Sequence, residues 1–161
     1  MRGEITREDR ALTKAQAIQL IKGAEYGVLA TVNNRNQPST VALNHVMIDD
    51  STLVFHSALI GEKIDNLRGN PHVSFFVVGE SNLLPKEYSV AYTSAVAHGK
   101  AFLVDDDDEK RAFLKAIADK FVGGHVPIKE QESYIEALFS KVALIKMEIH
   151  HLTGKGRQPS C

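Results

Sequence analysis

The chain has 161 residues, of which 43% are hydrophobic and 24% are charged, and its formal net charge is −1. These values suit one globular domain with its own core, and they give no basic footprint for nucleic acid or an anionic membrane. No apolar run approaches the roughly 20 residues that a membrane-spanning helix needs, and Met1–Arg10 lacks the apolar segment of a secretory signal. The single cysteine, Cys161, excludes a disulfide within the chain. We therefore expect one cytoplasmic domain over residues 1–161.

The first third of the chain predicts an arm, a helix and a hairpin. Residues 1–12 are a polar N-terminal arm. Thr13 and Gln16 have the spacing of a capping box, and the helical apolar stripe that follows ends near Glu25. The hairpin has a strand at Tyr26–Val32, a turn at Asn33–Gln37 and a second strand at Pro38–Ile48.

The stretch from Leu53 to Val78 predicts a strand, a short helix and another strand. The first strand begins with the apolar run Leu53–Phe55. The apolar residues Ile60, Ile64 and Leu67 have the spacing of one helix face, and this helix should end at Gly69–Pro71. The next strand is Val73–Val78.

The second half predicts a long strand, two helices and a final strand. The polar stretch Gly79–Glu87 is interpreted as a loop or lid. Tyr88–Val104 is long enough for a curved barrel strand, with Gly99 at a bend or bulge. One helix opens at Asp105–Glu109, a second lies within Pro127–Val142, the last strand is Val142–Leu152, and Thr153–Cys161 is a flexible tail.

The strands follow one another with short turns, which favours antiparallel pairing over parallel units. The fold class is therefore mainly β (α+β), with about six antiparallel strands in a small barrel and the helices packed outside.

The joint between the Leu53 strand and the next helix is the main candidate binding site. His56, Ser57, Gly61 and Lys63 place a hydroxyl, free backbone N–H groups and an ammonium at one helix N-terminus. Such a terminus suits a phosphate. The alternative from the residues alone is a capped helix with a solvated lysine and a hydrogen-bonded core histidine.

A metal site is not predicted, although the chain has seven histidines. His150 and His151 are adjacent, so on a strand they point to opposite faces. The acidic run Asp105–Asp108 lacks the alternating ligands and glycine of a calcium loop.

Two motifs resemble a known family. The run F-H-S-A-x-x-G-x-K, followed by L-x-x-N-P-x-V-x-F, resembles the flavin-binding split-barrel relatives of pyridoxamine phosphate oxidase, in particular the nitroimidazole-resistance-type branch. Tyr92 and Ser94 resemble the family's Y-x-S strand, with Ala95 where the family usually has valine. The resemblance extends from about Tyr26 to Gly156, and the oxidase's R-Q-V-R-like substrate motif is absent.

The resemblance implies a split barrel that binds FMN and forms a homodimer, with two flavins at the interface. It implies an oxidoreductase that takes a hydride from NADH or NADPH and reduces a small acceptor such as a nitroaromatic. Ser57 and Lys63 would hold the phosphate, Asn44, His45 and Val46 would line the ring, and His56 would lie by the substrate as a candidate catalytic acid. The implied cofactor-binding set is Asn44, His45, Val46, His56, Ser57, Ala58, Gly61, Lys63, Tyr92 and Ser94. Heme with a histidine ligand, a deazaflavin, or a non-catalytic flavin-binding module remain as alternatives.

Overall fold

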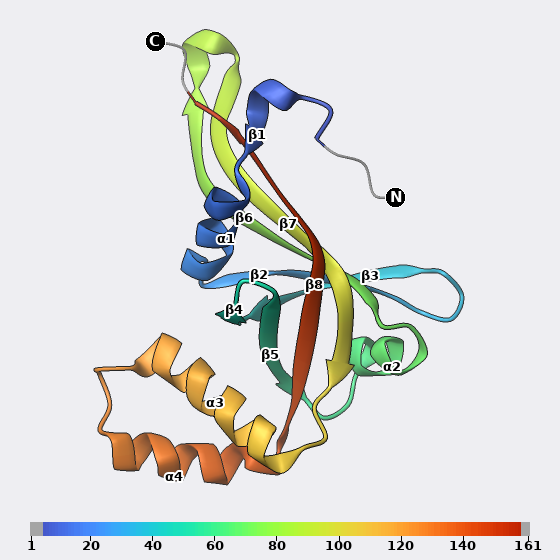
Figure 1. Cartoon of the computed structure of the whole chain (residues 1–161), viewed down its shortest axis with the longest axis vertical. Helices are drawn as coiled ribbons and strands as arrows, with labels where there is room; N and C mark the ends of the chain where they lie inside the picture. Colours follow the sequence, from blue (N-terminus) through green and yellow to red (C-terminus); the bar gives the residue numbers. More distant parts are fainter. Residues whose placement is uncertain (1–4, 159–161) are drawn as a thin grey trace.

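One antiparallel sheet of eight strands carries the fold in residues 5–158, which are the residues that the computed structural model describes (Figure 1). The strand order is β3-β2-β6-β7-β8-β5-β4, and β1 pairs with β8. The strands are β1 (Ala11–Leu12), β2 (Tyr26–Val32), β3 (Pro38–Asn44), β4 (Val46–Asp49), β5 (Thr52–Ala58), β6 (His72–Leu84), β7 (Ser89–Leu103) and β8 (Val142–Arg157). The helices are α1 (Lys14–Gly23), α2 (Glu62–Gly69), α3 (Asp107–Val122) and α4 (Ile128–Phe139), with short 3-10 turns η1 (Glu8–Arg10) and η2 (Pro85–Glu87).

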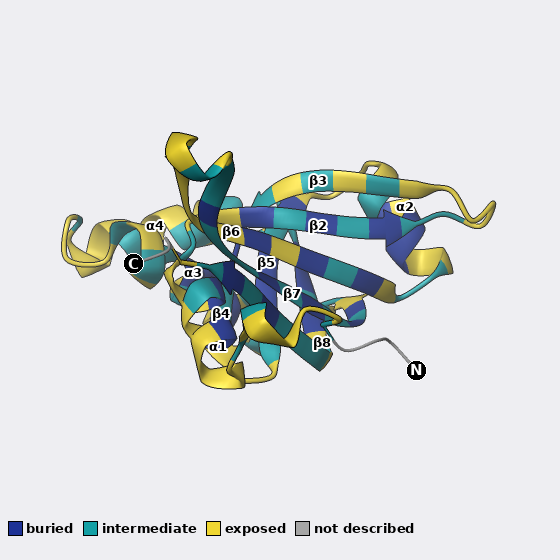
Figure 2. Ribbon diagram, turned by 90° about the horizontal axis from the view of Figure 1, so that it is seen from above, coloured by how far each residue is buried: buried dark blue, intermediate teal, exposed yellow. Residues whose placement is uncertain are grey.

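The sheet curls until β3 approaches β5, and this curl makes an open barrel. Buried and less buried residues alternate along β2 and β6, as Figure 2 shows, because successive side chains of a strand point to opposite faces. The interior contains Leu29, Phe55, Phe75, Ile145 and Met147, all fully buried. The predicted antiparallel fold class, a split barrel with peripheral helices, is confirmed.

Two helices complete this interior. The predicted capping box at the start of α1 is present, since the Thr13 side chain accepts from Gln16 N and the Gln16 side chain accepts from Thr13 N. Ala17 and Ile21 of α1 join the barrel core, as do Ile64 and Leu67 of α2. Ile60, which the helical spacing had assigned to the apolar face, instead lies in the loop before α2 and is exposed, because the helix begins only at Glu62.

Helices α3 and α4 lie together at one end of the molecule, beside β5 (Figure 1). Phe113, Leu114 and Ile117 of α3 pack with Val54 and Leu144 in a second, smaller cluster. Asp106 caps α3 by accepting from Glu109 N at 2.8 Å, so the acidic run opens a helix as predicted.

The strand count differs from the six that the sequence predicts. The expected strand Pro38–Ile48 is two strands, β3 and β4, separated at His45, and part of the expected polar arm forms η1 and β1. The break at His45 is a tertiary effect, because its ring is drawn into the core and hydrogen-bonds to Ile21 O.

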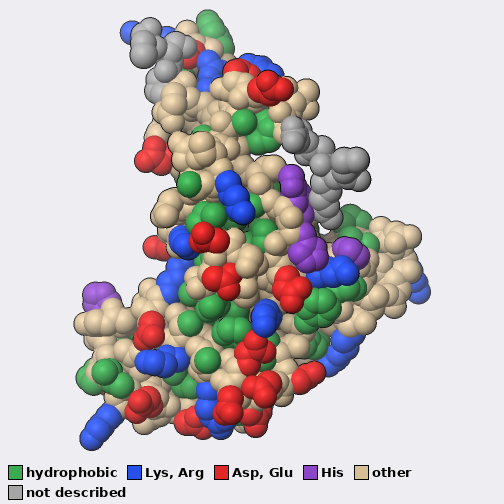
Figure 3. Space-filling view, in the orientation of Figure 1, with side chains coloured by type: hydrophobic (Ala, Val, Ile, Leu, Met, Phe, Trp, Pro, Cys, Tyr) green, Lys and Arg blue, Asp and Glu red, His purple; other side chains and the backbone are tan. Residues whose placement is uncertain are grey.

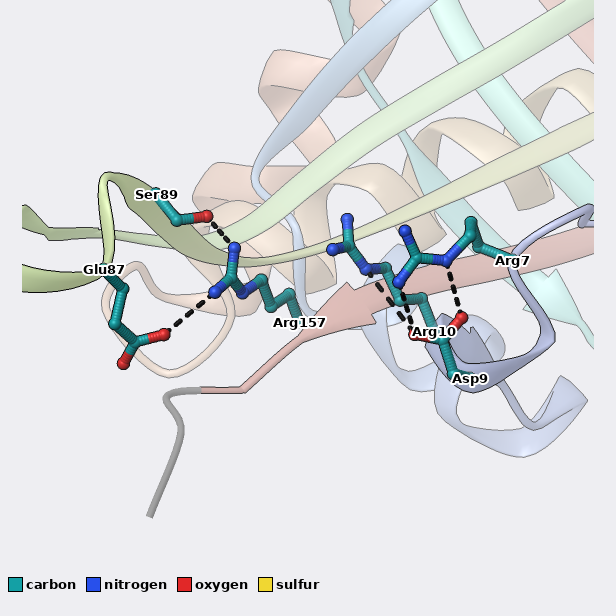
Figure 4. A network of polar contacts seen from close by, with 6 residues as sticks. All are labelled: Arg7, Asp9, Arg10, Glu87, Ser89 and Arg157. Carbon is teal, nitrogen blue, oxygen red and sulfur yellow. Dashed lines mark hydrogen bonds and ion pairs between the residues drawn. The ribbon is translucent and has the colours of Figure 1, made fainter.

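The polar stretch Gly79–Glu87, expected to be a loop or lid, is part of a long hairpin. Strand β6 continues to Leu84 and pairs there with Ser89 of β7. Arg157 at the end of β8 fixes the hairpin tip, donating to Ser89 Oγ and forming an ion pair with Glu87 at 2.8 Å (Figure 4). This stretch is therefore held in the sheet.

The expected flexible tail is also largely structured. Residues 153–157 belong to β8, and Gly154 and Gly156 are buried under Leu12 of β1. Cys161 lies outside the described residues. Acidic and basic side chains are interspersed over the lower part of the face in Figure 3. In residues 5–158, no helix combines the length and apolar character needed to cross a membrane.

Candidate functional site

Strand β5 separates the two central residues of the predicted site. Ser57 shares the interior face with Leu53 and Phe55, whereas His56 points to the other face with Val54, toward α3. Ser57 is only 6% exposed, and its Oγ has no hydrogen-bond partner among the described residues. The Nδ1 of His56 is also buried and, within the same part of the chain, unpartnered. A buried polar atom without a partner is costly, so both atoms mark positions where a hydrogen bond is missing.

The N-terminus of α2 follows five residues after Ser57. Gly61 is the N-cap, with φ 134° that favours glycine, and no side chain caps the helix. The first N–H groups of α2 therefore lack the side-chain acceptor that usually satisfies them. Lys63 is half-buried in this turn, and its ammonium has no ion-pair partner in residues 5–158. Together these donors form a candidate anion site.

Glu62 joins this turn to the edge of the barrel. Its carboxylate accepts from Ser39 Oγ of β3 at 3.0 Å. This contact ties β3 to α2 where the sheet is open, and it turns the Glu62 carboxylate toward β3. Ala58, at the end of β5, is exposed and pairs with Val142 of β8.

His45 lies in the core and not on a ligand-binding surface. Its ring packs edge-on against the Phe75 ring, with 4.8 Å between the ring centroids. Its Nε2 lies 2.7 Å from Ile21 O. Because a carbonyl only accepts, Nε2 carries the proton and Nδ1 is bare, buried and unpartnered among the described residues. Burial is the main cause that lowers the pKa of His45, to about 4. The hydrogen bond to the Ile21 carbonyl raises the pKa in part, and the nearby Lys120 ammonium lowers it by a smaller amount.

Asn44 and Val46 flank His45 but lie toward α3. Asn44 donates from Nδ2 to Glu25 O at 2.9 Å, and Val46 packs against the cluster of α3 and Val54. Lys120 of α3 donates to His45 O at 2.9 Å and to Ala24 O at 2.8 Å. This clamp fixes α3 against the β3–β4 break, and burial lowers the pKa of Lys120.

Tyr92 and Ser94 are remote from the β5–α2 joint within one chain. Leu103 of β7 is level with Phe55, because both pair with Ile145 of β8. Ser94 lies further along β7 by up to roughly 30 Å, at about 3.3 Å per residue. Its Oγ donates to Lys155 O at 3.4 Å, and Tyr92 pairs with Arg157.

The predicted residues therefore form two adjacent groups and a distant pair. Ser57, Gly61 and Lys63 provide donors for an anion, while Asn44 and His56 line a cavity on the α3 side of β5. The apolar residues of α3 and α4 in this cavity were not predicted, because their spacing indicates only an ordinary core-facing helix. In residues 5–158, no group of three or more metal-ligating side chains occurs.

Known proteins share the motif pattern and the fold. A family model described as pyridoxamine 5'-phosphate oxidase matches residues 13–156. No curated protein matches the chain.

Three solved structures have the same fold, and all are less than 25% identical to the chain. A conserved hypothetical protein from Mycobacterium tuberculosis has a TM-score of 0.80 and 16% identity, with 98% of this chain and 97% of that chain covered. A candidate 5-nitroimidazole antibiotic resistance protein from Bacteroides thetaiotaomicron has a TM-score of 0.76 and 23% identity, with 91% and 86% covered. A FAD-binding protein from Mesorhizobium loti has a TM-score of 0.69 and 22% identity, with 92% and 98% covered.

Proposed function

Since the chain belongs to the pyridoxamine 5'-phosphate oxidase family, we propose that it is a flavoprotein that binds FMN and works as an NAD(P)H-dependent oxidoreductase. The observation that carries this proposal is the unpartnered Ser57 hydroxyl five residues before the start of α2, whose N-terminus has no side-chain cap. A solved structure of the same fold is a FAD-binding protein, which supports a flavin as the ligand class.

The residues at the β5–α2 joint fit the phosphate of FMN. A phosphomonoester carries close to two negative charges at neutral pH and has several acceptor oxygens. Ser57 Oγ, the first N–H groups of α2 and the Lys63 ammonium supply hydrogen bonds and charge to such a group. The positive end of the helix dipole adds to the attraction.

The ring of the flavin would lie along β3. Among residues 5–158 this strand pairs with β2 alone, so the backbone groups on its other edge are outside the sheet ladder there. Asn44 lies at the end of β3, and His56 lies on the same side of the barrel as Asn44. The bound flavin would supply two-electron transfer, from a nicotinamide to an acceptor such as a nitroaromatic. His56 would orient the acceptor and hold a proton near it.

A homodimer would bring the distant pair of residues to the site. The outer face of the sheet exposes large apolar side chains, with Tyr26 63%, Phe76 38% and Val78 54% exposed. Ser94 pairs with Val78 and therefore shares this face, and Asn44 pairs with Tyr26. Two copies packed through this face would cover the apolar residues and place Tyr92 and Ser94 of one copy near the flavin of the other.

The absorption spectrum of the full chain, purified without added cofactor and again after incubation with FMN, tests the cofactor. Two broad bands in the near-ultraviolet and blue, bleached by NADH or NADPH, are the expected result. FAD, added in a parallel sample, should bind less tightly than FMN. A sharp Soret band would indicate heme instead of flavin. If the protein retains no chromophore and binds none, the cofactor proposal is overturned.

Light scattering of the protein in solution tests the dimer. The wild type should have twice the chain mass, and Val78→Lys should shift it toward the monomer with weaker FMN binding. Ile128→Glu is the matched control, because Ile128 is a similarly exposed apolar residue on α4, away from the outer sheet face. A monomeric wild type with full FMN affinity would overturn the dimer.

A further inference from the structure

A cavity of about 360 Å³ lies between β5 and the helices α3 and α4. Apolar side chains make up most of its wall, and His56 and Asn44 lie at its edge. The main apolar contributors are Leu114, Ile117, Ala118 and Phe121 of α3 with Tyr134 and Leu138 of α4. Its volume is in the range of small-molecule sites, and a few polar groups in an apolar wall are typical of them.

The cavity exists because α4 is incompletely packed. Ile135, Leu138 and Phe139 all face inward on α4, yet no residue of this helix is fully buried. Arg111 of α3 joins the two helices, through an ion pair with Glu136 at 3.1 Å and a contact with the Phe139 ring. At the other end of α3, the Lys120 clamp fixes the helix against β3 and β4. The positions of α3 and α4 are therefore fixed by these contacts, and the space between the helices and β5 is not closed by side chains.

The chemistry of the wall selects a neutral ligand. The described residues that line the cavity include no Lys, Arg, Asp or Glu. A charged ligand would lose its hydration without gaining an ion pair. Phe121 and Tyr134 offer faces and edges to a flat ring. His56 lines the cavity, and its imidazole is a wall group that can hydrogen-bond to the polar edge of such a ring.

We propose that this cavity binds a neutral aromatic compound of one or two rings with one polar edge, hydrogen-bonded to His56. The site is separate from the anion site, because His56 and Ser57 lie on opposite faces of β5. Its existence does not depend on the flavin. If the flavin proposal holds, this cavity is where the electron acceptor binds.

Titration calorimetry of the full chain with 2-naphthol, before and after saturation with FMN, tests the proposal. Ala118→Phe fills the cavity from α3 and should weaken 2-naphthol binding at least tenfold. Ala112→Phe is the matched control, because Ala112 is on the exposed side of the same helix. His56→Leu keeps an apolar side chain of similar size and should weaken binding roughly 3- to 10-fold, the value of one hydrogen bond.

Two further ligands test the chemical class. 2-Naphthalenesulfonate, with a permanent charge, and decanoate, with a flexible chain, should each bind at least tenfold more weakly than 2-naphthol. Tighter binding of either one would overturn the assignment of a neutral ring. Equal binding of 2-naphthol to the wild type and to a folded Ala118→Phe variant, checked by thermal unfolding, would overturn the site itself. Binding of 2-naphthol without any binding of FMN would leave this site standing and remove the flavin proposal.

Discussion

The imidazole of His45 donates from Nε2 to the carbonyl of Ile21 at 2.7 Å, inside the barrel core. The folded protein takes up a proton at His45 only near pH 4, whereas an unfolded histidine does so near pH 6.5. A second proton would have to reside on Nδ1, which has no partner among the described residues. The neutral ring is therefore part of the folded state.

This relationship predicts a loss of stability in acid. Between pH 6.5 and pH 4 the unfolded chain binds the proton and the folded chain does not, so the free energy of unfolding falls as the pH falls. The loss from His45 is at most roughly 3 kcal/mol. His45→Gln keeps a hydrogen-bond donor but has no titratable ring. The free energy of unfolding of this variant, measured in urea across the same pH range, should lack the part of the acid-induced loss that comes from His45. His150→Gln, at an exposed position, should keep the wild-type pH dependence; if His45→Gln keeps it as well, His45 is not the source.

Ser57→Ala should separate binding from stability. The buried Ser57 hydroxyl has no partner among the described residues, so its removal should leave the flavin-free protein as stable or up to about 1 kcal/mol more stable. The same change should weaken FMN binding roughly 3- to 10-fold through loss of one hydrogen bond. Thermal unfolding and titration calorimetry measure the two effects. Ser133→Ala, at an exposed site on α4, should change neither. A clear loss of stability in Ser57→Ala would assign the hydroxyl a structural role instead.

Lys63→Ala should weaken FMN binding several-fold or more, because a charge-assisted hydrogen bond to the phosphate is lost. The effect should shrink as the salt concentration rises, since screening weakens the attraction in the wild type. Arg68→Ala removes the same charge from the last turn of α2 and should have little effect. Unchanged FMN affinity in Lys63→Ala, measured by titration calorimetry, would remove Lys63 from the site.

Gly99→Ala should destabilise the protein by roughly 2–4 kcal/mol. Gly99 lies where the β7–β8 register shifts, and a Cβ there would overlap Glu148 O of the neighbouring strand. The sequence predicts a bend or bulge at Gly99, and the register does shift there, but the extra residue is His150 of the neighbouring strand β8. Gly99 itself is required by the close approach of the Glu148 backbone. Gly23→Ala in α1 is the control, because a Cβ meets nothing within 4 Å and alanine favours a helix. Equal stability of the two variants in urea unfolding would contradict this account of Gly99.

The sequence predicts most of the helices and strands correctly. The prediction fails where contacts with distant parts of the chain determine the local structure. Strand alternation places His56 beside Val54 correctly, but it cannot show that α3 and α4 cover that face, because they follow more than fifty residues later in the chain. The break at His45 depends on Ile21 and Lys120, which lie 24 and 75 residues away in the chain and outside the strand's own pattern.

The sequence does not predict the β6–β7 hairpin or the end of β8, for a different reason. Residues 80–83 of β6 are exposed on both sides, so they show none of the alternation that identifies a half-buried strand. Gly154 and Gly156 look like a mobile tail in the sequence, but they lie in β8, where Leu12 packs closely over both of them and Ala17 packs over Gly154. Composition alone does not reveal such packing.

In the part of the chain that the structure describes, strand β8 lies between β7 and β5 in the sheet and alone joins them, and it also pairs with β1. During synthesis on the ribosome, the ribbon β3-β2-β6-β7 can assemble as soon as β7 has emerged, while β5 waits with an open edge until residues 142–157 arrive. At about 5–20 residues per second, this wait lasts for several seconds. Chaperones that cover unpaired strand edges would act on the nascent chain in that interval, and a transcript truncated before β8 would yield a protein whose two half-sheets never join.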